Sequence, residues 1–230
     1  MKSKKGIIIG SVIGVVAIVI AFAVVVFGVK SLNSFDAQGY VRGILEQNFK
    51  GEIKEVSTVV DGQTEETLLQ QYEDGIEAFL KNRLMYGVEM DEETEEKYIA
   101  LCKEIFKTMK YEVKEAEKVG EEKYQVPVEY QTSDVFLKFD TLIAEESARI
   151  FAKADKGEYL GTVDEINLQM QQEFLDNSYE LLKKANEEAE YGEKETVVIV
   201  VEKNEKGLYT MGTQLNEFVL KITCEDVNQD

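Results

Sequence analysis

The side chains with the greatest capacity for chemistry in this 230-residue chain are its 45 aspartates and glutamates. Two carboxylates can act together as acid and base, as they do in glycosidases and in isomerases of the ketosteroid type. The chain has no histidine, the commonest general base near neutral pH and the usual partner of a serine or cysteine nucleophile. Because the sequence does not single out a pair of carboxylates, we assign no catalytic residue. We expect a protein that is not an enzyme.

Metal and cofactor sites are not indicated either. Two cysteines without histidine or a closely spaced second thiol do not form a recognisable zinc site. The acidic run after Asp91 lacks the alternating oxygen ligands and central glycine of an EF-hand, and it suits the start of a helix better. No glycine-rich loop follows an expected strand, so no phosphate cradle is predicted. We therefore expect no metal and no cofactor.

The two cysteines leave one alternative open. Cys102 lies in a helical apolar stripe with Tyr98, Leu101 and Ile105, which is typical of a small buried side chain. Cys224 follows Ile222 near the end of the chain. An extracytoplasmic location would also permit a disulfide between Cys102 and Cys224. The sequence supports both interpretations.

Residues 6–29 form an uncharged apolar run that could span a membrane, and its orientation would decide on which side the rest of the chain lies. A helix of this length covers roughly 36 Å, enough to cross a hydrocarbon core of about 30 Å. The basic stub of residues 1–5 is expected to stay in the cytoplasm, which places the rest outside. A cleaved signal ending after Ala23 is the alternative. Either interpretation places the domain outside the cytoplasm, and residues 30–35 form a short linker that keeps an anchored domain close to the membrane.

Charge restricts the partners of the outer part. Four of the 26 basic residues lie within 1–30, whereas all 45 acidic residues follow, so the remainder holds 22 basic residues and has a formal charge of −23. This charge repels nucleic acid, and we expect no nucleic-acid partner. The spacing of Gly6, Gly10 and Gly14 could favour helix pairing in a membrane. The oligomeric state is not determined by the sequence.

The first half of the domain, residues 36–132, reads as helices followed by a hairpin. Helical spacing begins after Asp36 and ends at Gly51. A second helix is expected from an N-cap at Thr64 to Gly87, with Leu69 in its apolar stripe. Asp91 opens a third helix. Alternation then predicts strands around Tyr111–Val113 and Tyr124–Tyr130, joined by a turn at 120–122. Pro127 cannot donate to a ladder, which predicts a local sheet edge or bulge there.

The second half, residues 133–224, repeats this order. A helical stripe runs from Phe139 to Ala154, and a capping box at Thr162 and Glu165 starts a long helix expected to end at Gly192. Residues 196–201 are apolar on both faces and predict a central strand covered on both sides. A turn at 204–207 leads to a short strand, a last helix through Leu215 and Ile222, and a polar tail at 225–230.

These elements predict one α+β domain over residues 36–224, in which helices pack on an antiparallel sheet of about four strands. Each hairpin alone has too few strands to bury its apolar face, so the two hairpins are expected to share a sheet. The repeated order of elements also fits a duplicated module. Tyr130 and Tyr209 could line a pocket, but packing within the sheet and core is the favoured interpretation.

Several short motifs carry a resemblance: residues 35–41 directly after the apolar run, 111–113, 123–128 and 207–209. They resemble uncharacterised membrane-anchored surface proteins and lipoproteins of Gram-positive gut bacteria, whose outer domains are similar to the cystatin-like and nuclear-transport-factor-like folds. The resemblance implies a surface location and helices packed into the concave face of a curved antiparallel sheet. It implies no catalytic residues, and this chain lacks the lipidated cysteine of the lipoprotein members.

The resulting expectation is a membrane-anchored extracytoplasmic protein that acts as a non-enzymatic binding module. Its ligand would be an envelope component, peptide or partner protein bound through the concavity of the fold. The alternative is a cell-envelope hydrolase or isomerase that uses buried carboxylates. It would require a buried, water-accessible pair of aspartate or glutamate side chains with raised pKa. A structural or regulatory role in a membrane complex is a third option.

Overall fold

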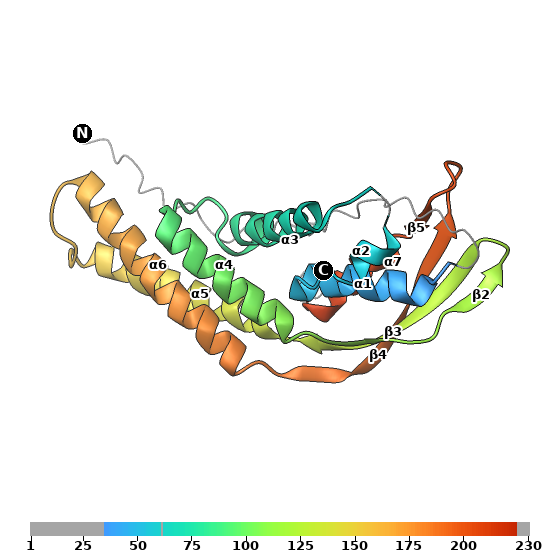
Figure 1. Cartoon of the computed structure of the whole chain (residues 1–230). Helices are drawn as coiled ribbons and strands as arrows, with labels where there is room; N and C mark the ends of the chain where they lie inside the picture. Colours follow the sequence, from blue (N-terminus) through green and yellow to red (C-terminus); the bar gives the residue numbers. More distant parts are fainter. Residues whose placement is uncertain (1–34, 61, 225–230) are drawn as a thin grey trace.

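The computed structural model describes residues 35–60 and 62–224, and it has an α+β fold in which helices pack on a curled antiparallel sheet. The sheet and the helices that line it lie at one end of an elongated molecule, and a group of longer helices forms the other end (Figure 1). Within the described residues, no helix is long and apolar enough to cross a membrane. The expected span at 6–29 lies outside these residues.

The domain begins with helix α1 (Ala37–Lys50) and the short helix α2 (Val56–Val59). The Asp36 carboxylate caps α1 by accepting a hydrogen bond from the Gly39 N–H at 2.8 Å. Gly51 ends the helix in the left-handed conformation, with φ of 69°, as its sequence position predicts. Arg42 of α1 donates to both carboxylate oxygens of Glu55, at 2.7 and 2.9 Å, and so ties α1 to the start of α2.

Helix α3 (Glu65–Phe79) continues into a π-helical turn, η1 (Leu80–Leu84), and helix α4 (Glu92–Lys107) follows. The predicted N-caps are confirmed, since Thr64 and Asp91 accept hydrogen bonds from Thr67 and Thr94. In η1, Arg83 donates to both carboxylate oxygens of Asp140 at 3.1 and 2.7 Å. This bidentate pair holds the turn against a helix far along the chain.

The sheet consists of β1 (Lys110–Val113), β2 (Glu117–Gly120), β3 (Lys123–Ser133), β4 (Tyr191–Lys203) and β5 (Tyr209–Met211). Its order is β1-β3-β4-β5, and β2 pairs with β3 on the same side as β1. All pairs are antiparallel. The β3–β4 pair joins the two halves of the chain, which confirms the shared sheet, while the duplication stays a prediction.

Pro127 lies at an interruption of the ladder, as its missing N–H requires. It falls between the register of β1, which ends opposite Val128, and that of β2, which starts opposite Gln125. The Pro127 carbonyl accepts a hydrogen bond from the Lys114 N–H at 2.9 Å. The backbone of Pro127 therefore faces the gap between β1 and β2, and the β3–β4 ladder loses no hydrogen bond.

Helices α5 (Val135–Asp155) and α6 (Val163–Glu187) form a long antiparallel pair that projects beyond the sheet, with α4 beside it (Figure 1). The predicted capping box at the start of α6 is present, with hydrogen bonds in both directions between Thr162 and Glu165. Tyr98 of α4 donates to the Leu175 carbonyl at 2.8 Å inside this group. We call this projection the helical arm.

The core lies between the helices and the concave face of the sheet, which is covered by α1 and by the last helix, α7 (Gln214–Ile222). Phe218 of α7 is completely buried and has edge-on contacts with Phe49, Tyr111 and Tyr130, with ring centroids 5.4 to 6.2 Å apart. Such contacts add to the burial of the rings. One aromatic side chain therefore links helix α1, strand β1 and strand β3.

Three details of the sequence interpretation are wrong. Strand β4 is not covered on both faces, because Val197, Ile199 and Val201 are buried whereas Val198 is 40% exposed. The strand starts at Tyr191 rather than Thr196, and α6 ends at Glu187 rather than Gly192, since the chain returns to extended structure before the apolar run. Leu69, placed in the apolar stripe of α3, is 43% exposed.

Replacement of Phe218 by alanine tests how much the fold depends on the packing of α7. We expect the free energy of unfolding of the full chain to fall by about 3–5 kcal/mol, because a cavity opens between α1 and the sheet. Denaturant unfolding followed by circular dichroism measures the change. Leu160→Ala is the control, since Leu160 is 78% exposed and its loss should change stability by less than about 0.5 kcal/mol. Equal effects of the two substitutions would contradict the packing described.

Candidate functional site

The concave face of the sheet is not available to a ligand. Val126, Val128 and Ile199 point into it and are completely buried. Tyr40 and Phe49 of α1 are also completely buried, and so is Phe218 of α7. The protein's own helices therefore fill the space against this face, and binding of a partner in the concavity of the fold stays a prediction that these residues do not support. The surfaces that the described residues leave open to a partner are the outer face of the sheet and the outside of the helices.

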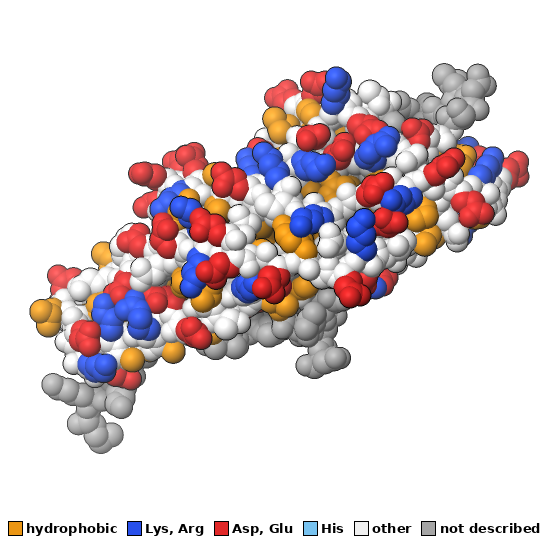
Figure 2. All heavy atoms as spheres, turned by 90° about the horizontal axis from the view of Figure 1, so that it is seen from below, with side chains coloured by type: hydrophobic (Ala, Val, Ile, Leu, Met, Phe, Trp, Pro, Cys, Tyr) orange, Lys and Arg blue, Asp and Glu red, His pale blue; other side chains and the backbone are white. Residues whose placement is uncertain are grey.

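The outer face of the sheet carries an apolar strip between charged ends. The register places Pro127 beside Val198 and Gln125 beside Val200, with these side chains on the outer face. At one end of the strip lie Lys110, Glu112, Glu129 and Lys194, and at the other lie Lys123 and Glu202. Seen from below, charged side chains of both signs are interspersed with small apolar groups (Figure 2). This surface is mixed rather than strongly acidic.

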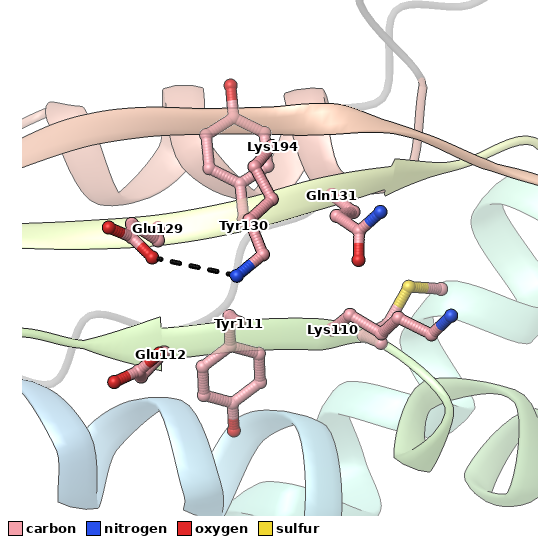
Figure 3. A pocket seen from close by; sticks show the side chains of 8 residues that line it. Lys110, Tyr111, Glu112, Glu129, Tyr130, Gln131 and Lys194 are labelled. Atoms are coloured by element: carbon pink, nitrogen blue, oxygen red, sulfur yellow. Dashed lines mark ion pairs between the residues drawn. The ribbon is translucent and has the colours of Figure 1, made fainter.

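A pocket of about 290 Å³ opens at the first of these charged ends (Figure 3). The outward side chains of Glu129 and Gln131 from β3 and of Lys194 from β4 lie around it, whereas the ring of Tyr111 points away from β3. Its size is close to the lower limit for small-molecule sites. It is lined by Met109, Lys110, Tyr111, Glu112, Glu129, Tyr130, Gln131 and Lys194.

Charges around the pocket are paired with one another. Lys114 bridges Glu112 and Glu129, with Nζ–O distances of 2.8 and 2.9 Å, and Lys194 lies 4.0 Å from Glu129. The hydrogen bond from Lys114 lowers the pKa of Glu112, and the hydrogen bonds that Lys114 donates to Glu112 and Glu129 raise the pKa of Lys114. Lys110 lies over the Tyr191 ring at 3.4 Å from its centroid. The two displaced pKa values favour the charged forms of Glu112 and Lys114, whereas a carboxylic acid that donates a proton near neutral pH needs a raised pKa.

Two carboxylates of the helical arm, the buried Glu146 and the partly exposed Glu173, form a network. Glu146 accepts from Arg149 and Asn177, and Glu173 accepts from Arg149, Lys153 and Tyr159. The hydrogen bond from Arg149 lowers the pKa of Glu146, and hydrogen bonds, first from Lys153, lower that of Glu173 from 4.5 to about 2. The network joins α5 to α6 and holds both carboxylates ionised. Both pKa values are lowered, whereas the predicted acid–base enzyme would need a buried pair of carboxylates with raised pKa values.

One pair of carboxylates does have pKa values displaced in opposite directions. The hydrogen bonds from Arg42 lower the pKa of Glu55, whereas burial raises that of Glu46, and the negative charges of Glu55 and Glu52 raise it further. Among the described carboxyl groups with displaced pKa, only that of Glu46 is raised. Such a division of roles can support acid–base chemistry. Both side chains are partly exposed, at 22% and 31%.

The remaining sequence candidates are structural. Tyr130 and Tyr209 are buried, as favoured, although Tyr130 also borders the pocket and donates to Glu195 at 3.1 Å. Cys102 and Cys224 form no disulfide in the structure; Cys102 is a buried thiol, and burial raises its pKa to about 12. Within residues 35–60 and 62–224, no cluster of three or more acidic or cysteine side chains could hold a metal.

Both ends of the molecule have distinctive side chains. At the sheet end, Phe35 stacks on Tyr209 with centroids 3.7 Å apart and planes 4° from parallel, and its edge also meets Tyr124. At the tip of the helical arm, Leu160, Val163 and Leu168 are exposed by 78%, 59% and 65%.

Comparison with known proteins identifies no relatives: no family model, curated protein sequence or solved structure matches this chain significantly. Function must therefore be argued from the geometry.

Sequence reasoning missed three features of the surface. The Arg42–Glu55 contact, the carboxylate network of the arm and the pocket each join residues from separate elements. The Arg149–Glu146 spacing of three residues on a helix was a readable local signal. The pairing of Lys114 with Glu129 depends on strand register, which residue types alone do not give.

The network of the arm predicts a specific loss of stability in acid. Because the folded pKa of Glu173 is lowered, its contribution is complete above the unfolded pKa and disappears as the pH falls from about 4.5 to about 2. Glu173→Gln should therefore be less stable than wild type at pH 7, on the order of 1–2 kcal/mol with allowance for solvent screening.

Denaturant unfolding of both proteins between pH 7 and pH 2 measures this difference. The two stability curves should converge toward pH 2. Glu180→Gln, on the exposed side of the same helix, is the matched control and should follow wild type throughout. A constant gap between wild type and Glu173→Gln across the acid range would contradict the assignment.

Proposed function

We propose that this chain is a membrane-anchored extracytoplasmic protein that acts as a non-enzymatic interaction module. Residues 6–29 form the anchor, with the N-terminus in the cytoplasm. The domain presents its outer sheet face and its helical arm to partners in the cell envelope. Its outer domain belongs to the cystatin-like type at the level of architecture, as the curled sheet packed on α1 and α7 supports. Fold likeness alone does not choose a function.

The observation that carries this proposal is the position of Phe35, where the chain joins the domain and is held against the sheet. The stack of Phe35 on Tyr209 and its contact with Tyr124 hold the first described residue against the sheet. Five residues, 30–34, separate it from the apolar run, a distance of at most about 17 Å. An anchor there keeps the sheet end near the bilayer. The tip of the helical arm lies at the opposite end of the molecule (Figure 1).

An interaction role fits the chemistry of the described surface better than catalysis does. The carboxylates of the arm are ionised and paired, and the pocket is lined by paired charges. The concave face, where related architectures can hold a ligand, is filled by α1 and α7. The outer face of the sheet is an extended surface on which charges of both signs and apolar groups are interspersed. Such surfaces suit recognition of another macromolecule.

The alternative is an envelope hydrolase or isomerase, and one observation favours it. Glu46 and Glu55 have pKa values displaced in opposite directions on adjacent elements. If they work as acid and base, Glu46→Gln should abolish hydrolysis of envelope glycans or isomerisation while the fold is kept. Assays of the purified full chain with cell-wall fragments test this. Turnover that is lost in Glu46→Gln but kept in Glu52→Gln would favour the enzyme over the interaction module.

The topology itself can be tested in cells that express the full chain. In a background with Cys102→Ser and Cys224→Ser, we would introduce Lys156→Cys at the tip of the helical arm or Ser3→Cys in the basic stub. A maleimide that cannot cross membranes should label Lys156→Cys in intact cells, and Ser3→Cys only after lysis. The reverse pattern would overturn the proposed location.

A carbonate wash of the same membranes distinguishes an anchor from a cleaved signal. The anchored chain stays in the membrane fraction, because transfer of an apolar helix into water is unfavourable. Release of a shortened chain into the medium would show cleavage after Ala23. That result would keep the extracytoplasmic location and overturn the anchor.

A further inference from the structure

Part of strand β4 has a sheet neighbour on one side only. Strand β5 pairs with Val201, Glu202 and Lys203, so residues 191–199 have β3 on one side and no described strand on the other. Lys194, Thr196 and Val198 lie in this stretch and are exposed. We call residues 194–198 the free edge.

The backbone of the free edge points away from the sheet at every second residue. The Pro127 carbonyl faces β1 and β2, so Val126 and Val128 bond to their partners on β4, Ile199 and Val197. Residues 194, 196 and 198 therefore direct their N–H and C=O groups to the opposite side. The Val200 carbonyl, which has the same parity, also points away from β3. It accepts a hydrogen bond at 2.9 Å from the N–H of Gly212, which directly follows β5.

The free edge thus presents three consecutive pairs of backbone donors and acceptors. No described residue forms a hydrogen bond with the backbone of 194, 196 or 198 on this side. An unpaired edge is a template for another strand, and proteins commonly protect such edges with charges. Lys194 gives some protection here. The apolar strip that begins at Val198 lies directly beside the edge and gives an added strand something to pack on.

The side chains of the edge specify what a new strand should carry. On the outer face, Thr196 and Val198 favour β-branched neighbours. On the other face lie Glu193 and Glu195, which are exposed and form no ion pair with any described cation, although Glu195 accepts from Tyr130. These two carboxylates are two residues apart on the same face of the strand, so they favour basic residues directly opposite them on an added strand. The edge is complementary to a strand in which basic and β-branched residues alternate.

We propose that the free edge of β4 binds an extended segment of a partner protein, as an added antiparallel strand with alternating basic and β-branched residues. The antiparallel direction follows the other pairs of this sheet. Main-chain hydrogen bonds would give affinity and the two faces would give specificity. This inference rests on the proposed interaction role and gives it a site. A second copy of the chain is a poor occupant, because its edge carries the same glutamates and each chain has a net charge of −19.

The test uses the purified full chain in detergent and a synthetic nine-residue peptide of alternating valine and lysine with blocked ends. In the proposed geometry, valine side chains lie beside Thr196 and Val198, so the valine N–H groups point toward β4. Backbone methylation of the valines should weaken binding at least about tenfold, whereas methylation of the lysine N–H groups should leave the affinity within about threefold. Fluorescence anisotropy measures both affinities.

Two variants of the protein test the same hydrogen bonds from the side of β4. Thr196→Pro removes one outward N–H without loss of a bond to β3, just as Pro127 does in β3, whereas Thr196→Val keeps it. We expect Thr196→Pro to lose at least about tenfold in affinity and Thr196→Val to bind like wild type. Circular dichroism checks that both fold, and if Thr196→Pro does not, the methylated peptides still decide the question.

Three results would overturn the inference: no binding of the unmodified peptide below about 1 mM, equal loss with both methylated peptides, or dimerisation of the chain through β4 in place of peptide binding. These outcomes are independent of the labelling experiment on topology. An extracytoplasmic domain that binds no peptide keeps the proposed function and removes only this site, whereas a cytoplasmic domain would remove the proposed function even if the edge binds.

Discussion

The structure depends on the burial of the concave sheet face beneath α1 and α7. Phe218 contacts Phe49 from α1, Tyr111 from β1 and Tyr130 from β3, so one side chain connects elements from both ends of the chain. Neither hairpin has enough strands to bury this face alone. The two halves therefore fold as one unit, because each supplies strands to a sheet that the helices of the other also cover.

Filling the concave side has a functional consequence. A sheet with one face closed can recognise a partner only through its outer face or through an unpaired edge, and this protein retains both. The helical arm is held by a separate polar network around Glu173 and contributes reach rather than a cavity. The stack of Phe35 on Tyr209 fixes where the chain enters the domain, which gives the molecule a sheet end and a distal end relative to an anchor.

Much of the fold was predictable from local signals. Caps at Thr64, Asp91 and Thr162 and the alternation in β3 gave the elements, because each depends on neighbours a few residues away. The site was less predictable. The apolar run at 196–201 suggested a strand covered on both faces, but β-branched residues also suit an exposed face, and Val198 lies there. A ligand was expected in the concavity of the fold, because no local pattern shows how completely α1 and α7 fill it. The free edge arises from the short length of β5, which only the pairing reveals.

Native-state hydrogen exchange across β4 of the full chain tests the central claim most directly: the sheet is closed on its concave side and open along one edge. The amides of Val197 and Ile199 should exchange slowly because they bond to β3, whereas those of Lys194, Thr196 and Val198 should exchange orders of magnitude faster. Alternating protection of this kind supports the account. Uniformly slow exchange from 194 to 199 would show that the edge is already covered and would contradict it.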